Sequence, residues 1–387
     1  MSTLGAMRAR WAVPALALLA LVPVSGAAAG PVWQGWQPVP GVFDLGGPRS
    51  NGSLLVAGSA ALYTLTQAGD LEPFARGPGG YHDDPGAEAY LAVSPGQHVA
   101  AAGCDFVRDE VFILREHTPI GVTRVDKTGS ETGSFTNVNL PSLNGIAFDT
   151  NAAFDHRLLV TGAINGKTEV VAIDCTGAVQ VVTKSAPVLE GGLAVVPPSF
   201  GQFAGDLIAP DELSGTIWAI APDGTSKQVV NSGLPKGGDI GVESVAFVPP
   251  GFAKGGYAYY ADRATPGNPH PGTDHVLRIS SDDLVAAGVQ DGDLLAATEG
   301  GASMIDVRCD PVACKVTTVV ATPTSAHGEG HLVFTLNPKA SPSPTPSATA
   351  TAAPKSSSAS VAPYVAIAAA ILAAFAAGLF VARRRRP

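Results

Sequence analysis

The sequence has few charged and few aromatic side chains, which make up 15% and 6% of its 387 residues. It contains no Gly-x-Ser-x-Gly motif, no phosphate-binding loop and no dinucleotide-binding fingerprint, so the common sequence signals of serine hydrolases and nucleotide-binding enzymes are absent. It also lacks a basic excess. The formal net charge is −9, and it is −15 when six arginines near the two ends are removed: Arg8, Arg10, Arg383, Arg384, Arg385 and Arg386. This acidic balance argues against nucleic acid as a partner, because phosphates require a basic face.

Cysteine is scarce as well, with four residues in the chain. Cys309 and Cys314 enclose a four-residue turn and predict a disulfide that closes a hairpin, which leaves Cys104 and Cys175 to pair by elimination. A zinc site would need two close pairs or histidines at ligand spacing, which Cys104 and Cys175 do not supply. Two structural disulfides are typical of a protein outside the cytosol.

Residues 1–29 have the pattern of a secretory signal peptide. Arg8 and Arg10 precede an apolar run from Trp11 to Val24, and the small residues 27–29 permit cleavage after Ala29. The run is short for the alternative, an uncleaved anchor.

The C-terminal end predicts a membrane anchor. Residues 338–360 are almost entirely Ser, Pro, Thr, Ala and Lys, a composition typical of an extended stalk. Residues 361–382 carry no charge, and as a transmembrane helix they would span about 33 Å, which is enough for a bilayer. The basic tail 383–387 is expected in the cytoplasm. We therefore expect a single-pass cell-membrane protein whose ectodomain, residues 30–337, lies at the cell surface.

A strand followed by a tight turn recurs four times in the ectodomain. The segments "LYTLTQAG", "VTRVDKTG", "VVAIDCTG" and "IWAIAPDG" end at Gly69, Gly129, Gly177 and Gly224. Each has aliphatic residues seven and four positions before its glycine, and glycine adopts the positive φ of a hairpin turn at low cost. Each unit therefore contains an antiparallel hairpin.

A second recurring element is a polar residue followed by a short apolar strand. It reads "EAYLAV", "NGIAF", "EGGLAV", "ESVAF" and "EGHLVF", and a further strand follows most copies, for example "VFIL" or "GYAYYAD". Four strands in roughly 50 residues are typical of a β-propeller blade. The sequence thus predicts an all-β, six-bladed propeller, with five or seven blades and a β-sandwich as alternatives. The segment "SSDDLVAAG" predicts a short inserted helix. The last strand is expected to complete the first blade, which holds Leu54 to Phe74, and so to close the ring.

These motifs resemble the six-bladed propeller superfamily that includes NHL-repeat proteins and SMP-30/gluconolactonase-like hydrolases. The similarity covers about residues 42 to 335. In the hydrolases, the resemblance implies, a Glu, an Asn and an Asp hold a divalent metal and the Asp takes part in the chemistry. Asn144 matches their Asn, and Glu88, Glu190 or Glu329 could match their Glu. No aspartate stands at an equivalent strand start, where Glu243 is the nearest acidic residue.

First strands of propeller blades line a central channel and run in the same direction, so their starts converge on one mouth. A divalent cation, with calcium first, is one way to compensate the charge gathered there. The other is that some of the carboxylates bind protons with raised pKa values. If there is no metal site, these polar residues cap backbone N–H groups or face water in the channel. Strand alternation separates the five residues into two sets unless Gly191 and Gly330 host bulges. The predicted metal-site residues are Glu88, Asn144, Glu190, Glu243 and Glu329.

Five histidines are weaker pocket candidates: His82, His270, His275, His327 and His331. His327 and His331 are not part of the repeat, and polar surface is the simpler interpretation for them. His270 and His275 lie in a long Gly/Pro-rich loop, a location that often carries function.

Two functions remain. The first is a surface module that binds an unknown extracellular ligand or protein, which the stalk favours, and the second is an extracellular metal-dependent hydrolase of lactones or related esters. The missing aspartate favours the non-enzymatic function.

Overall fold

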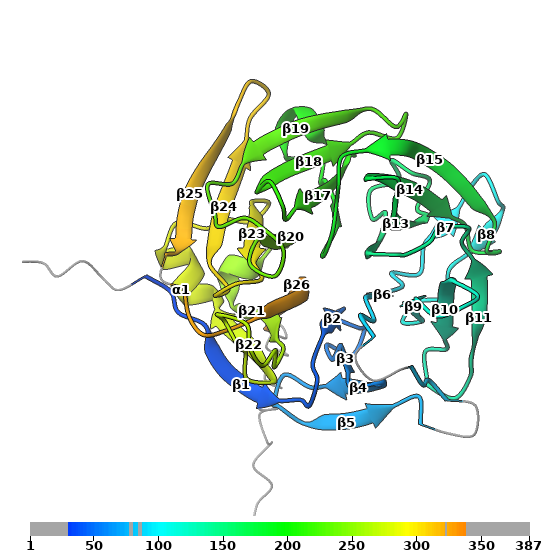
Figure 1. Ribbon diagram of the computed structural model, residues 1–387, viewed down its shortest axis with the longest axis horizontal. Coiled ribbons are helices and arrows are strands. Elements are labelled where there is room, and N and C mark those ends of the chain that lie inside the picture. The colour runs from blue at the N-terminus through cyan, green and yellow to red at the C-terminus, as the bar shows by residue number, and fades with distance from the viewer. Residues whose placement is uncertain (1–29, 77–79, 84–86, 322, 338–387) are drawn as a thin grey trace, which may run out of the picture. The chain divides into compact units, whose positions relative to one another are not determined.

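The computed structural model describes residues 30–337 except 77–79, 84–86 and 322. Six four-stranded antiparallel sheets surround a common axis (Figure 1). This arrangement confirms the six-bladed propeller, and it excludes the sandwich and the rings of five or seven blades.

The first four blades follow the order of the chain, from an inner strand at the axis to an outer strand at the rim. Blade 1 contains β2 (Asp44–Gly46), β3 (Leu54–Gly58), β4 (Ala61–Leu65) and β5 (Leu71–Phe74). Blade 2 contains β6 (Leu91–Val93), β9 (Val111–Arg115), β10 (Gly121–Val125) and β11 (Thr132–Asn137). Blade 3 contains β12 (Gly145–Phe148), β13 (Leu158–Ile164), β14 (Lys167–Ile173) and β15 (Val179–Ala186). Blade 4 contains β16 (Ala194–Val195), β17 (Leu207–Asp211), β18 (Thr216–Ile220) and β19 (Ser226–Asn231).

The last two blades are interleaved in the chain. Blade 5 contains β20 (Val242–Phe247), β23 (Leu294–Thr298), β24 (Met304–Cys309) and β25 (Cys314–Val320). Blade 6 contains β26 (Gly328–Leu336), β21 (Gly256–Asp262), β22 (His275–Ser280) and β1 (Gln34–Pro38). The prediction that "GYAYYAD" is the second strand of the "ESVAF" unit is therefore wrong, because this segment crosses to blade 6 and β23 takes its place. The predicted short helix is α1 (Ser281–Ala286).

The ring closes differently from the expectation. β26 pairs with β21 and not with the blade of Leu54 to Phe74, which has its own inner strand, β2. The N-terminal β1 forms the outer strand of blade 6 by pairing with β22. One blade thus contains both ends of the described chain (Figure 1). The sequence pattern did not predict β2, because a strand of three residues is too short to show a periodic alternation.

Three shorter elements lie outside the blades. β7 (His98–Val99) pairs with β8 (Cys104–Asp105), and two turns of 3₁₀-helix occur at η1 (Gly201–Phe203) and η2 (Phe252–Lys254). Both expected disulfides are present. Cys104–Cys175 joins the β7–β8 excursion of blade 2 to blade 3, and Cys309–Cys314 joins β24 to β25.

The hydrophobic core consists of six layers, one between each pair of neighbouring blades. The alternation of side chains along each strand explains this arrangement. In β17, Leu207 and Ala209 pack toward blade 3, whereas Ile208 between them packs toward blade 5. The layer between blades 6 and 1, which includes Tyr259 and Leu54, completes the circle. Because every blade is buried on both faces, removal of one blade would expose two layers.

The four repeated glycines are the turns between third and fourth strands, and all have positive φ. Two of them also need the absence of a side chain. A Cβ on Gly129 would lie 2.7 Å from the backbone nitrogen of Ala75, and one on Gly224 would lie 2.6 Å from the carbonyl oxygen of Val182. Glycine is therefore required at these positions both by the turn conformation and by the close contact between the turn and the preceding blade.

At the axis, the buried carboxylate of Asp44 joins strands of three blades. It accepts hydrogen bonds from the backbone nitrogens of Leu45 in β2, Leu91 in β6 and His331 in β26, at 2.7, 2.6 and 2.6 Å. The His331 imidazole adds a contact of 2.9 Å from Nδ1, while its Nε2 lies 2.9 Å from the carbonyl oxygen of Ile146 in β12. Because a carbonyl only accepts and a carboxylate accepts from Nδ1, both ring nitrogens carry protons. Burial lowers the pKa of His331, but the charge of Asp44 outweighs it and raises this pKa.

Four sequence predictions concern residues outside the described part of the chain: the signal peptide (1–29), the stalk (338–360), the transmembrane helix (361–382) and the basic tail (383–387). Among the described residues, no helix is long and apolar enough to cross a bilayer.

Replacing Asp44 with Ala should destabilise the propeller by about 3–5 kcal/mol, because it leaves a buried imidazolium without its counter-ion and three backbone donors without an acceptor. Chemical denaturation followed by circular dichroism measures the loss. The exposed Glu72 on β5 provides the control, since Glu72→Ala should change the free energy of unfolding by about 0.5 kcal/mol or less. Equal effects of the two substitutions would show that the axial carboxylate is dispensable.

Candidate functional site

The starts of the inner strands gather acidic residues at one mouth of the channel. Glu88 precedes β6 and Glu190 precedes β16, whereas Glu243 and Glu329 are the second residues of β20 and β26. Burial raises the pKa of Glu190, and the charges of Glu212 and Glu88 raise it further; burial and then the charge of Glu329 raise the pKa of Glu243. Gly330 has φ of 67° at a register shift between β26 and β21, as expected of a bulge that keeps Glu329 directed at the mouth.

The second strands bring another set of charged residues to the same mouth. They run antiparallel to the inner strands, so a second strand ends where an inner strand starts. Four charged residues directly follow second strands: Glu116 after β9, Glu212 after β17, Arg263 after β21 and Glu299 after β23. Sequence analysis missed all four. The pattern that could have predicted them is a charged residue directly after the buried second strand of a blade.

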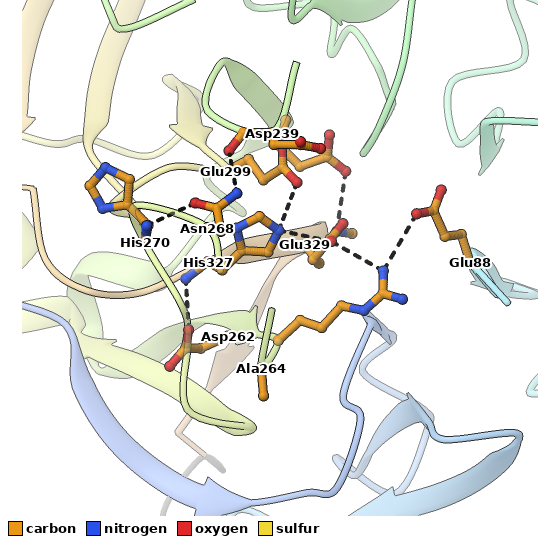
Figure 2. A network of polar contacts seen from close by, with 12 residues as sticks. Glu88, Asp239, Asp262, Ala264, Asn268, His270, Glu299, His327 and Glu329 are labelled. Carbon is orange, nitrogen blue, oxygen red and sulfur yellow. Dashed lines mark hydrogen bonds and ion pairs between the residues drawn. The ribbon is translucent and has the colours of Figure 1, made fainter. Parts of the chain in front are cut away.

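The most closely packed part of this mouth contains Glu299, His327 and Glu329 (Figure 2). The Nε2 atom of His327 lies 2.9 Å from Oε1 of Glu299 and 3.4 Å from Oε1 of Glu329. Arg263 continues the chain of charges, because its Nη1 lies 3.3 Å from Oε1 of Glu329 and 3.4 Å from Oε1 of Glu88. Glu88 is the most accessible member, with its side chain 47% exposed, whereas that of His327 is 2% exposed.

The positive charges of Arg263 and His327 do not balance the carboxylates around them. The pKa values of the acidic residues reflect this excess of negative charge. Burial, followed by a hydrogen bond to Glu299, raises the pKa of Glu212 to about 8. Burial and neighbouring carboxylates raise the pKa values of Glu116 and Glu190 to about 7. Burial lowers the pKa of His327, but its hydrogen bonds to the carboxylates outweigh burial and bring this pKa to about 9. At neutral pH the mouth therefore holds shared protons.

Glu243 lies deeper in the channel and is fully enclosed. Its Oε1 accepts a hydrogen bond of 2.7 Å from the hydroxyl of Tyr90 and one of 3.3 Å from the backbone nitrogen of Gly330. Burial, the charge of Glu329 and that of Glu299 raise its pKa well above the usual range. This environment favours the neutral form of Glu243, which is a buried partner of the Tyr90 hydroxyl.

Asn144 lies beside the acidic set but uses its side chain locally. Its Nδ2 donates a 2.8 Å hydrogen bond to the carbonyl oxygen of Leu189, which fits the alternative that strand-start residues bind backbone groups. Its Oδ1 is buried and has no hydrogen-bond partner within the described residues. Among the described His, Cys, Asp and Glu side chains, Glu299, His327 and Glu329 are the three whose ligand atoms all lie within 4.8 Å of one another. Only Glu329 belongs to both this group and the five predicted metal-site residues.

The other candidate histidines occupy different positions. His327 and His331 are buried, so the interpretation of these two as polar surface is wrong. His331 belongs to the axial ion pair with Asp44. His270 lies in the loop between β21 and β22, with its Nδ1 2.7 Å from the carbonyl oxygen of Thr324. His275 is the first residue of β22, and its Nδ1 lies 2.7 Å from the carbonyl oxygen of Thr273. His82 is exposed.

No family model matches the sequence, and no curated protein matches it. Solved structures with a similar arrangement include a streptogramin B lyase, with 12% identity over 79% of this chain and 95% of that one and a TM-score of 0.42. A putative gluconolactonase gives 11% identity over 79% and 89% of the two chains and a TM-score of 0.43. A putative TolB from Agrobacterium tumefaciens gives 14% identity over 77% and 90% and a TM-score of 0.42. These similarities are too distant to carry an argument about the site.

Unfolding should become easier as the pH rises from about 5 to about 9. Glu212 and His327 have folded-state pKa values of about 8 and about 9, above their ordinary values of 4.5 and 6.5, so the stabilisation that protonation gives is lost as the pH passes through the higher values. Glu212→Gln should leave stability unchanged at pH 5 and raise it at pH 9 by on the order of 1 kcal/mol after solvent screening. Urea denaturation in the presence of a chelator measures both.

The exposed Glu131 supplies a matched control, because Glu131→Gln should leave the pH profile unchanged. A wild-type stability that stays level between pH 5 and pH 9 would contradict the proton sharing at the mouth.

Proposed function

We propose that this protein is a membrane-anchored, extracellular propeller that binds a ligand or protein through a divalent cation at its acidic mouth. The signal-peptide pattern, the stalk and the uncharged 361–382 segment support the location. The excess of carboxylates over cations at the mouth supports the binding of a cation.

The observation that carries the proposal is the group of Glu299, His327 and Glu329, whose ligand atoms lie within 4.8 Å of one another. Two carboxylate oxygens and one imidazole nitrogen are a common set of metal ligands. Nε2 of His327 points at both carboxylates, so the proton that it carries stands where a cation would be held. If His327 loses this proton, its Nε2 and the carboxylates of Glu299 and Glu329 become available as three metal ligands.

The donor set changes the expected metal. The sequence suggested calcium among Glu88, Asn144, Glu190, Glu243 and Glu329, which offer only oxygen. An imidazole ligand suits zinc or manganese better than calcium, which prefers oxygen. Three protein ligands also leave coordination positions for an external ligand. Glu212 lies beside Glu299 and could hold that ligand by a hydrogen bond.

Zinc or manganese ions should raise the melting temperature of the full chain more than calcium does. At an ion concentration of one hundred times Kd, the free energy of unfolding should increase by about 2.7 kcal/mol. Binding at pH 7.5 should release a proton from His327, which calorimetry in buffers of different ionisation enthalpy detects.

Glu299→Gln should blunt the response to the ion, and Glu131→Gln should not. If neither zinc nor manganese shifts the melting curve at millimolar concentration, the metal centre does not exist and the mouth is a hydrated polar pore.

A second candidate function, metal-dependent hydrolysis of lactones or related esters, is favoured by Glu212. Its pKa of about 8 makes the ionised form of Glu212 a stronger base than an ordinary carboxylate, and a cation bound next to it at Glu299 would favour that ionised form, which could then accept a proton from water. A bound divalent ion would polarise the ester carbonyl. Arg263 and Glu88 would orient a substrate that enters from solvent.

If this function holds, Glu212→Gln should lower kcat for lactone hydrolysis by about a hundredfold or more while the ion still binds. Hydrolysis of a panel of lactones, followed by pH-stat titration with zinc or manganese present, measures the effect. A wild-type chain that binds the ion but hydrolyses none of the lactones would leave the protein as a binding module.

A further inference from the structure

The opposite end of the channel contains an apolar cavity of about 460 Å³. The inner segments of all six blades line it, and each contributes a residue of apolar type: Leu45, Leu91, Ile146, Leu193, Ala246 and Phe334. Because the acidic residues stand where the inner strands start, the ends of these strands, which include Val93 and Phe148, face away from the acidic mouth. The cavity is thus a site separate from the proposed metal centre.

The floor of the cavity contains a charged side chain, His331, whose charge is balanced within the protein. His331 lines the cavity, and its charge is paired with the buried carboxylate of Asp44 at 2.9 Å. Its Nε2 contacts the carbonyl oxygen of Ile146. The floor therefore needs no counter-ion from a bound molecule, and the cavity presents a mainly apolar wall.

The rim carries two charged side chains, and one of them, a guanidinium, makes no ion pair within the described residues. Arg108 and Asp109 are the charged residues there, on the loop before β9. Asp109 already accepts hydrogen bonds from the backbone nitrogen of Ser50, at 2.8 Å, and from its hydroxyl. Arg108 is exposed and makes no ion pair within the residues that the structure describes. A molecule with a negative group would complement it.

We propose that this cavity binds a small organic anion with an apolar body, of the aryl- or alkyl-carboxylate class. Its volume falls within the range of about 300–1,000 Å³ that is typical of small-molecule sites, which combine apolar walls with a few polar groups. The apolar body fills the space between the six inner segments, and the carboxylate pairs with Arg108 at the rim. The site lies apart from the acidic mouth, so it operates without the metal ion.

The test uses the full chain in lipid nanodiscs, with empty nanodiscs as the blank, and 4-phenylbutanoate as the probe. Isothermal titration calorimetry in the presence of a chelator should show saturable binding to one site. Ala246→Phe, which places a ring in the cavity, should abolish binding, and Ala194→Phe should do so independently if the first variant folds poorly. Ala178→Phe, on an exposed hairpin turn, is the matched control and should bind like the wild type.

The charge is tested with Arg108→Gln, which should weaken binding of 4-phenylbutanoate by about threefold, as expected for an exposed ion pair, and leave binding of the neutral 4-phenylbutanol unchanged. Lys227→Gln, an exposed cation on the outer strand β19, should change neither affinity. The proposal is overturned if the wild type shows no saturable binding at millimolar probe. It is also overturned if correctly folded Phe variants bind normally, or if Arg108→Gln affects anion and alcohol alike. None of these outcomes depends on the ion at the opposite mouth.

Discussion

The carboxylate of Asp44 is the interaction on which the ring depends. It is fully buried, and it gathers backbone hydrogen bonds from β2, β6 and β26, strands that lie at the beginning and the end of the described chain. The imidazolium of His331 both neutralises this charge and extends the contact to β12. The close approach requires Gly330, because a Cβ there would lie 2.3 Å from Oδ1 of Asp44. A buried ion pair that receives all its hydrogen bonds fixes one arrangement of the strands, since any other would leave charges unpaired.

This axial pair also separates two chemically different ends of the channel. On one side, the buried pair of Tyr90 and Glu243 adjoins a mouth rich in carboxylates. On the other side, His331 forms the floor of an apolar cavity. Burial raises the pKa values of Glu190, Glu212 and Glu243, and neighbouring carboxylates raise them further.

The antiparallel pairing within each blade explains why one mouth holds so much charge. An inner strand begins, and the next strand ends, at the same edge of the sheet, so each blade can present two residues there. Blade 5 presents Glu243 and Glu299, and blade 6 presents Glu329 and Arg263. These two blades are interleaved in the chain. Glu299 of blade 5 and Glu329 of blade 6 both contact His327, and Arg263 contacts Glu329. Most of the candidate ligands therefore come from one sector of the ring.

The sequence by itself determined the blade unit, because hairpin turns and buried alternation are local properties. Gly69, Gly129, Gly177 and Gly224 marked four turns, and the spacing of the strand starts indicated six blades. The spacing of Cys309 and Cys314 predicted one disulfide, and elimination left Cys104 and Cys175 for the other. It also placed Glu88, Glu190, Glu243 and Glu329 at one mouth. Only the tertiary structure decided which strand joins which blade, since the pairing of β26 with β21 and of β1 with β22 connects segments far apart in the chain. For the same reason it alone brought Glu299 and Arg263 to His327 and turned two apparent surface histidines into buried partners of carboxylates.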